Sequence, residues 1–253
     1  MDAYRKELVI VAKRRFLQCV CALGLGSALL LAAGCHAPGT GQNIDGVRYF
    51  QQGQPQAAIY QFQQALAANP ASPDAYYNLA ATYHHLGKQN ADTAMLSQAE
   101  NLYHQCLDVH PDHVACHRAL AVLLVDTNRP QSAFTLLERW STRSPQVADS
   151  RIELARLHEE FGDAGLAKRY LGEAIDVQPG NPRAWAALAR LRETQGEYAQ
   201  ALSNYQQAYA LNNYQPGLPE RIASLQQRVA VGGGSYGSGG TRLVEDPRGW
   251  TRR

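Results

Sequence analysis

The chain has 253 residues, of which 24 are Lys or Arg and 22 are Asp or Glu, so that its formal net charge is only +2. A balance this close to neutrality argues against nucleic-acid binding and against strong electrostatic attraction to anionic lipid. The sequence also contains no nucleophile elbow, phosphate-cradling glycine loop or His-Glu-x-x-His run. We therefore expect a protein that is not an enzyme and does not bind nucleic acid.

The first segment, residues 1–34, has the order of a secretory signal peptide: a basic start, an apolar stretch over residues 16–33, and small residues at its end. It leads into the run LAAGC at residues 31–35, which resembles the lipobox of bacterial lipoproteins. That resemblance implies that a peptidase cuts before Cys35 and that the Cys35 thiol carries a diacylglyceryl group. Residues 35–42 would then be the lipidated cysteine and a short tether.

Two other interpretations of this segment stay open. It is nearly long enough to be an uncleaved signal anchor, and it also fits an ordinary cleaved signal. All three interpretations place the rest of the chain outside the cytoplasm. The lipoprotein interpretation implies a lipid anchor in a membrane with the chain facing the periplasm, and His36 after the cysteine favours the outer membrane by analogy with enteric sorting.

The region from residue 39 to residue 215 repeats one pattern of small, large and proline positions about every 34 residues. In the fourth repeat the pattern is Leu154, Ala155, Gly162, Ala167, Leu171, Ala174 and Pro179. This pattern resembles the tetratricopeptide repeat (TPR). The resemblance implies an all-α, right-handed α-solenoid over residues 43–215, with about five helical hairpins at about 39–72, 73–113, 114–147, 148–181 and 182–215. Such a stack has a binding surface and no built-in reaction chemistry.

Glycines and prolines mark the expected helix ends. A left-handed residue is needed where the first helix of each hairpin stops, and the sequence offers Gly53, Gly87, Gly162 and Gly196. Proline cannot continue a helix, and the second helices are followed by Pro70, Pro111, Pro145 and Pro179. The second repeat departs from the period by about seven extra residues. We place them at residues 88–97, as a longer turn or an early extension of the second helix, either as a partner-contacting protrusion or as a tolerated surface insertion.

After the last repeat, residues 216–230 carry Ile222, Leu225 and Val229 on one face and polar residues on the other. This pattern predicts a capping helix with a solvated outer side. Residues 231–253 begin with a Gly/Ser run and predict a flexible tail.

Two cysteines, Cys106 and Cys116, lie within the repeats. Either a disulfide or two buried free thiols fits them, because the sequence does not give the Cα spacing that a disulfide needs. A cluster of His110, His113, His117 and Cys116 also has the residue types of a zinc site. The repeat already explains a turn at this position, so we expect no metal.

The TPR resemblance implies that the first helix of each hairpin lines a groove that holds a protein or peptide. The candidate groove residues are Tyr77, Asn78, His84, Arg118, Arg156, Arg183 and Arg190. In this family the position of Asn78 often bonds a ligand's backbone, and we assign His84 to the end of its helix. Four arginines favour an acidic or carboxylate-terminated segment, although a mixed-charge solvated face is an equal alternative.

Together these features predict a membrane-anchored scaffold or adaptor that mediates protein–protein interactions in the cell envelope. The resemblance to bacterial TPR lipoproteins adds a second candidate, a pilotin-like assembly factor for a type IV pilus or secretion system. An enzyme is a third and remote candidate, for which the sequence offers no catalytic residue. We expect no cofactor and no small-molecule substrate.

Overall fold

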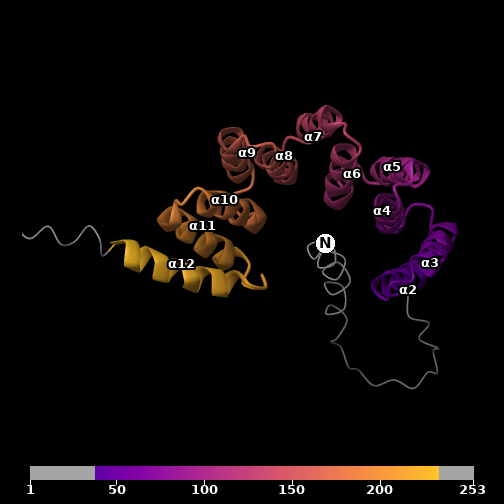
Figure 1. Ribbon diagram of the computed structural model, residues 1–253, viewed down its shortest axis with the longest axis horizontal. Coiled ribbons are helices and arrows are strands. Elements are labelled where there is room, and N and C mark those ends of the chain that lie inside the picture. Colours follow the sequence, from indigo (N-terminus) through magenta and orange to yellow (C-terminus); the bar gives the residue numbers. More distant parts are fainter. Residues whose placement is uncertain (1–37, 234–253) are drawn as a thin grey trace, which may run out of the picture. The chain divides into compact units, whose positions relative to one another are not determined.

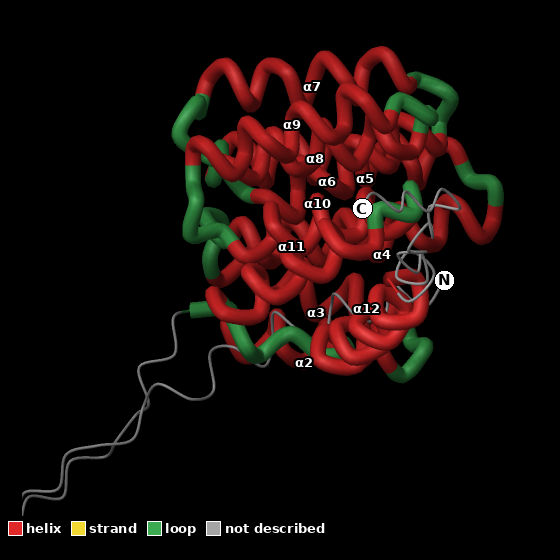
Figure 2. Tube along the Cα trace, turned by 90° about the vertical axis from the view of Figure 1, so that its left-hand side faces the viewer, coloured by secondary structure: helices red, strands yellow, loops and turns green. Residues whose placement is uncertain are grey.

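The computed structural model describes residues 38–233, and within that range the chain forms eleven helices and no strand (Figure 2). The expected all-α array of helical hairpins is therefore confirmed. The proposed signal segment, the lipidation candidate Cys35 and residues 234–253 of the tail lie outside the described residues. No helix between residues 38 and 233 has the length and apolar character needed to cross a membrane.

The chain divides into two units, an N-terminal half, Met1–Trp140, and a C-terminal half, Ser141–Arg253. The helices of the N-terminal half are α2 (Thr40–Gln51), α3 (Pro55–Ala68), α4 (Pro73–Asn90), α5 (Thr93–Val109), α6 (Val114–Asp126) and most of α7 (Pro130–Arg143). Those of the C-terminal half are α8 (Ala148–Glu160), α9 (Ala164–Val177), α10 (Pro182–Thr194), α11 (Tyr198–Leu211) and α12 (Leu218–Gly233). Within each half, consecutive helices pack as hairpins: α2 on α3, α4 on α5, α8 on α9 and α10 on α11 (Figure 1).

Most helix ends lie where the glycines and prolines predict them. Gly53, Gly162 and Gly196 follow the first helices with φ angles of 75°, 82° and 79°, the left-handed region that costs glycine little. The third repeat uses Asn128 instead, with φ 59°, and asparagine is among the residues that best tolerate this conformation. The four expected prolines each come two residues after the last residue of a second helix.

The second repeat corrects one prediction. Gly87 does not end α4, which continues to Asn90, and the left-handed residue is Ala91 at φ 53°. The extra residues lengthen α4 to 18 residues and α5 to 17, and only Ala91 and Asp92 separate them. A longer turn is thus wrong, and an early extension of the second helix accounts for only part of the excess. Gly87 is instead a contact point, because a Cβ atom there would lie 2.9 Å from the Leu96 side chain of α5.

The same register position of each repeat supplies the contact between paired helices. The alanines at this position are all fully buried: Ala58, Ala99, Ala133, Ala167 and Ala201. Four residues later each second helix places a large buried side chain: Phe62, Tyr103, Leu137, Leu171 and Tyr205. Small residues let helix axes approach to about 8–10 Å, and the large ones fill the space beside them. The core is therefore a row of equivalent contacts, one for each hairpin.

The helix α12 packs against α11 at the end of the C-terminal half. Leu218 and Leu225 are buried there and Ile222 is partly buried. The outer residues of α12, such as Gln226 and Gln227, are exposed. The helix α12 thus covers an apolar face of the α10–α11 hairpin.

We predict opposite stability changes for two Gly→Ala substitutions in helix interiors. Gly46 on α2 faces Phe62, and an added Cβ atom would lie 2.5 Å from the ring, so Gly46→Ala should lower the free energy of unfolding by about 1–3 kcal/mol through overpacking. Gly172 on α9 has no atom within 4 Å of its Cβ position, so Gly172→Ala should raise stability by up to about 1 kcal/mol through helix propensity. Urea denaturation gives the free energy of unfolding of both variants. A stabilised Gly46→Ala variant would contradict the packing described.

Candidate protein-binding surface

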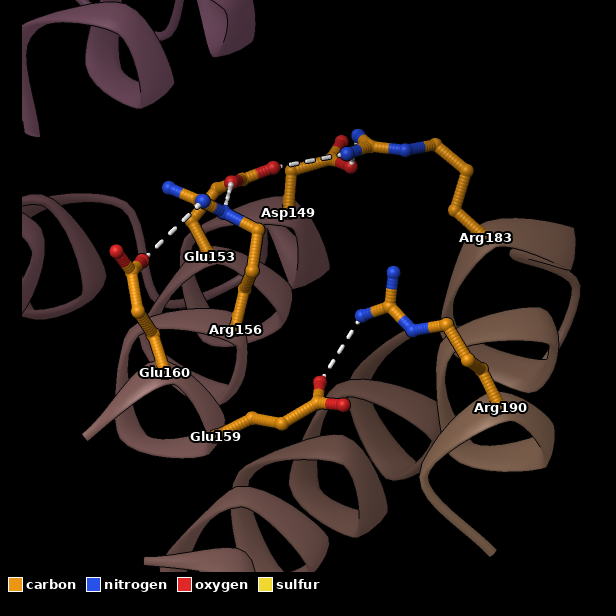
Figure 3. A network of polar contacts seen from close by, with 7 residues as sticks. All are labelled: Asp149, Glu153, Arg156, Glu159, Glu160, Arg183 and Arg190. Atoms are coloured by element: carbon orange, nitrogen blue, oxygen red, sulfur yellow. Dashed lines mark hydrogen bonds and ion pairs between the residues drawn. The ribbon is translucent and has the colours of Figure 1, made fainter. Parts of the chain in front are cut away.

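In the C-terminal half, α8 and α10 are the first helices of consecutive repeats and lie in contact. Charged side chains join them (Figure 3). Arg183 of α10 donates to Asp149 and, over 2.9 Å, to Glu153 of α8. Further along the same helices, Arg190 donates to Glu159 over 3.0 Å. The two helices are therefore linked by ion pairs at both ends of their contact.

The carboxylate of Glu153 is buried, with its side chain only 1% exposed. It accepts hydrogen bonds from Arg183 and, over 3.2 Å, from Arg156 of its own helix. Arg156 also lies 3.7 Å from Glu160. A buried carboxylate is tolerated only when it is paired and hydrogen-bonded, so the Arg156 and Arg183 side chains have a structural role at Glu153.

A similar ion pair joins α10 to α12. Arg221 donates to Glu193 over 2.7 Å, and the hydroxyl of Tyr205 donates to the same carboxylate over 3.1 Å. Burial raises the pKa of Tyr205 to about 12, opposed by the nearby charge of Arg221. The hydroxyl therefore keeps its proton at neutral pH and remains a donor to Glu193.

The sequence analysis named the arginines on α8 and α10 as candidate binding residues but missed two of their partners, Asp149 and Glu153. A signal was present, because Asp149 and Arg183 are 34 residues apart and occupy the same position in consecutive repeats. Such positions meet when hairpins stack. Opposite charges one period apart thus indicate an ion pair between neighbouring first helices.

Two arginines, Arg190 on α10 and Arg221 on α12, can still donate hydrogen bonds to another molecule. The Arg190 and Arg221 side chains are 47% and 48% exposed, and each pairs with a carboxylate that is itself partly solvated. A guanidinium carries five N–H donors, so one carboxylate contact leaves donors for a further acceptor. The arrangement can therefore bind a carboxylate from another molecule at α10 and α12.

The candidate groove residues of the N-terminal half are more buried than Arg190 and Arg221. Asn78 is 7% exposed and donates to Asn43 over 2.9 Å, which joins α4 to α2. His84 is 2% exposed, and its Nε2 atom lies 3.1 Å from Asp126 at the end of α6. Both were expected to line a groove, and the structure instead buries them between first helices. Tyr77 and Arg118 are partly buried.

Burial favours the neutral form of His84. Desolvation lowers the pKa of His84 and outweighs the opposing effect of its hydrogen bond to Asp126. The same Asp126 oxygen lies 2.7 Å from the Nζ atom of Lys88, which supplies the positive charge of this contact. The expectation that His84 lies at a helix end is wrong, because α4 continues for six more residues to Asn90.

The two cysteines of the repeats are joined by a disulfide in the structure, with Cα atoms 6.6 Å apart. Cys106 is on α5 and Cys116 is on α6, so the bond links the second hairpin to the third. His113, at the N-cap of α6, lies beside both sulfur atoms. His117 does not join this group, since it stacks on Trp140 with ring centroids 4.0 Å apart.

These features define a class: an all-helical repeat scaffold whose first helices present polar side chains. Four family models match the sequence, one described as "TPR repeat" at residues 46–87 and three described as "Tetratricopeptide repeat" at residues 96–148, 128–191 and 184–220. The chain is a tetratricopeptide repeat protein, and it is a scaffold for protein–protein interaction. A search of curated protein sequences found no match.

A comparison with solved structures found matches at low sequence identity, and those with TM-scores of 0.54 and 0.50 share the fold. A thermophilic TPR protein from Thermus thermophilus is 23% identical with a TM-score of 0.54, covering 75% of this chain and 99% of that chain. PilW, described as a widely conserved type IV pilus biogenesis factor, is 18% identical with a TM-score of 0.50, covering 76% and 87%. PilF from Pseudomonas aeruginosa is 17% identical with a TM-score of 0.47, covering 76% and 90%.

We predict that two arginines of α10 differ in their effect on stability. Arg183→Gln removes a guanidinium partner of buried Glu153 and should cost about 1–3 kcal/mol. Arg190→Gln removes a partner of the more exposed Glu159 and should cost less than about 1 kcal/mol. Urea midpoints of the two variants give the comparison. Equal losses would contradict the structural role assigned to Arg183.

We also predict a pH effect of His84. Because the folded-state pKa is lowered, the unfolded chain binds the proton first as the pH falls below about 6.5. Stability should therefore decrease from that pH down to the lower folded-state pKa. The measurement is the free energy of unfolding against pH for the wild type and for His84→Asn. The variant should lose the part of the pH dependence that comes from protonation of His84. The neighbouring His85 is exposed, and His85→Asn is the control that should keep most of this pH dependence, because burial is the largest cause of the lowered pKa of His84 and the charge of His85 the smallest.

Proposed function

We propose that this chain is a lipid-anchored adaptor of the cell envelope that holds a protein partner carrying acidic side chains or a C-terminal carboxylate. Membership in the tetratricopeptide repeat family supports the scaffold part of this proposal. The anchor is supported by the lipobox-like run at residues 31–35 and by the basic and apolar segments before it. Attachment at Cys35 would keep the repeats at the membrane surface, where other envelope proteins assemble.

The observation that carries the partner's chemistry is the exposure of Arg190 and Arg221 on the ion-paired helices α10 and α12. Each faces a carboxylate of this chain, Glu159 or Glu193, at 3.0 Å and 2.7 Å. Exposed pairs of this kind contribute about 0–1 kcal/mol. A desolvated, forked contact to a partner's carboxylate is stronger, since hydrogen bonds to charged groups contribute about 1.5–3 kcal/mol. An acidic partner can therefore displace or share these contacts.

The test is crosslinking and capture from membranes of the native cells with the tagged full-length chain. We expect the double variant Arg190→Ala/Arg221→Ala to lose at least about tenfold in capture, as the loss of one charge-assisted bond implies. The matched control is Arg169→Ala on α9, because Arg169 is 59% exposed and pairs with Glu173 of its own helix. Unchanged capture by the double variant would overturn this binding surface.

Intact mass tests the anchor separately. We expect a chain that begins at Cys35 and carries lipid, and a Cys35→Ala variant that is no longer modified. An unmodified chain that retains residues 1–34 would overturn the lipoprotein proposal. The captured partner distinguishes the two candidate pathways, since a pilus or secretion-system component would favour the assembly factor and a cell-wall enzyme would favour the general adaptor.

A further inference from the structure

We propose that Cys106, Cys116 and His113 form a zinc site when the disulfide is reduced, so that this bond covers a metal site between the second and third hairpins. The ligand atoms of the three side chains all lie within 4.8 Å of one another. They come from three places in the fold: the last turns of α5, the N-cap of α6 and the first turn of α6.

The spacing requires only a small adjustment to hold zinc. With Zn–S bonds of about 2.3 Å and a Zn–N bond of about 2.1 Å, tetrahedral ligand atoms are about 3.5–3.8 Å apart. The Cα atoms of the two cysteines are 6.6 Å apart, near the upper end of the range of about 4.4–6.8 Å for disulfides. Two separated thiolates therefore fit on this backbone without a shift of either helix. Water would complete the coordination as the fourth ligand, as in open Cys₂His sites.

The surroundings of His113 are those of a metal-binding histidine. Its Nδ1 atom accepts a hydrogen bond from the backbone N–H of Cys116 over 3.1 Å, so the ring proton is on Nε2. That Nε2 atom lies 3.4 Å from Asp74 of α4. A carboxylate on the second ring nitrogen is the usual orienting partner of a zinc-bound histidine. Nδ1 thus has its lone pair directed toward the N-terminal turn of α6, where Cys116 lies.

Reduction and metal binding balance in electrons and protons. A dithiol reductant gives two electrons and two protons to the Cys106–Cys116 bond, and becomes a disulfide itself. The two thiols then lose their protons as Zn²⁺ binds, and Nδ1 of His113 exchanges the Cys116 N–H for the metal. Both cysteines are fully buried, whereas the His113 side chain is 14% exposed. The metal would therefore enter on the His113 side.

The ligand set differs from the one that the sequence pattern offered. His117 is held by its stack on Trp140 and by a 2.9 Å contact between its Nε2 atom and the carbonyl of Pro111. The sequence grouped Cys116 with its neighbours in the chain and did not include Cys106. The structure brings Cys106 into the group because α5 packs on α6.

The experiment titrates the reduced full-length protein in detergent with Zn²⁺ against a chromophoric chelator, and with Co²⁺ as a spectroscopic probe. We expect one Zn²⁺ per chain at this site and the visible spectrum of tetrahedral, thiolate-bound Co²⁺. The disulfide form should show neither. The Cys106→Ala/Cys116→Ala variant corrects for Zn²⁺ that is bound elsewhere on the chain.

Two substitutions test His113 and its partner. Asparagine is also a good N-cap residue, so His113→Asn keeps the start of α6 while removing the nitrogen ligand, and it should weaken Zn²⁺ binding at least tenfold. Asp74→Asn should weaken it about 10–100-fold as a positioning residue. His104→Asn, on the exposed side of α5, is the control and should bind like the wild type. Equal affinity in the wild type and His113→Asn would overturn the proposal, as would loss of helical circular dichroism on reduction.

Discussion

Each helix between residues 38 and 233 depends on its neighbour in the chain to bury its apolar side, because a single hairpin has no core of its own. The contact that satisfies this need is the same in each repeat: a fully buried alanine followed one turn later by a large side chain, as in Ala167 and Leu171. A larger residue at the alanine position would separate the helix axes. The spacing of each pair, and with it the position of each polar side chain, follows from this one packing contact.

The same register decides which charges meet. Equivalent positions of consecutive repeats lie next to each other, so Asp149 of α8 faces Arg183 of α10. In the N-terminal half the equivalent stacking of α4 and α6 brings Asp126 to His84 and Lys88. Polar contacts between repeats are therefore a by-product of core packing, and they stabilise the stack only where burial removes competition from water.

The hairpins and most of their ends could be predicted from the sequence, because glycine and proline mark helix ends by backbone geometry alone. Gly162 and Gly196 illustrate this, with φ angles near 80°. Gly87 could not be assigned in the same way. A period reveals how many residues are extra but not where the turn falls, and in the second repeat an alanine, Ala91, takes the left-handed position.

The candidate surface was less predictable for a different reason. The sequence identifies Arg156, Arg183 and Arg190 as residues of first helices. Whether each guanidinium can bind another protein depends on the carboxylates of this chain that pair with it, and only the stacked structure shows these. Glu153 is nearly fully buried, although its charge alone predicts a solvated side chain. The alternatives for Cys106 and Cys116 stayed open in the sequence because they depend on a distance across two helices.

The two halves consequently differ in what their polar residues can do. In the N-terminal half, Asn78 and His84 are buried and already hydrogen-bonded, and breaking such a contact costs the full desolvation of the group that is left. In the C-terminal half, Arg190 and Arg221 are half exposed, and exchanging one carboxylate for another leaves no group buried and unpaired. The acidic partner that we propose would therefore be bound at α10 and α12, while the polar residues of α4 fix how its hairpin stacks.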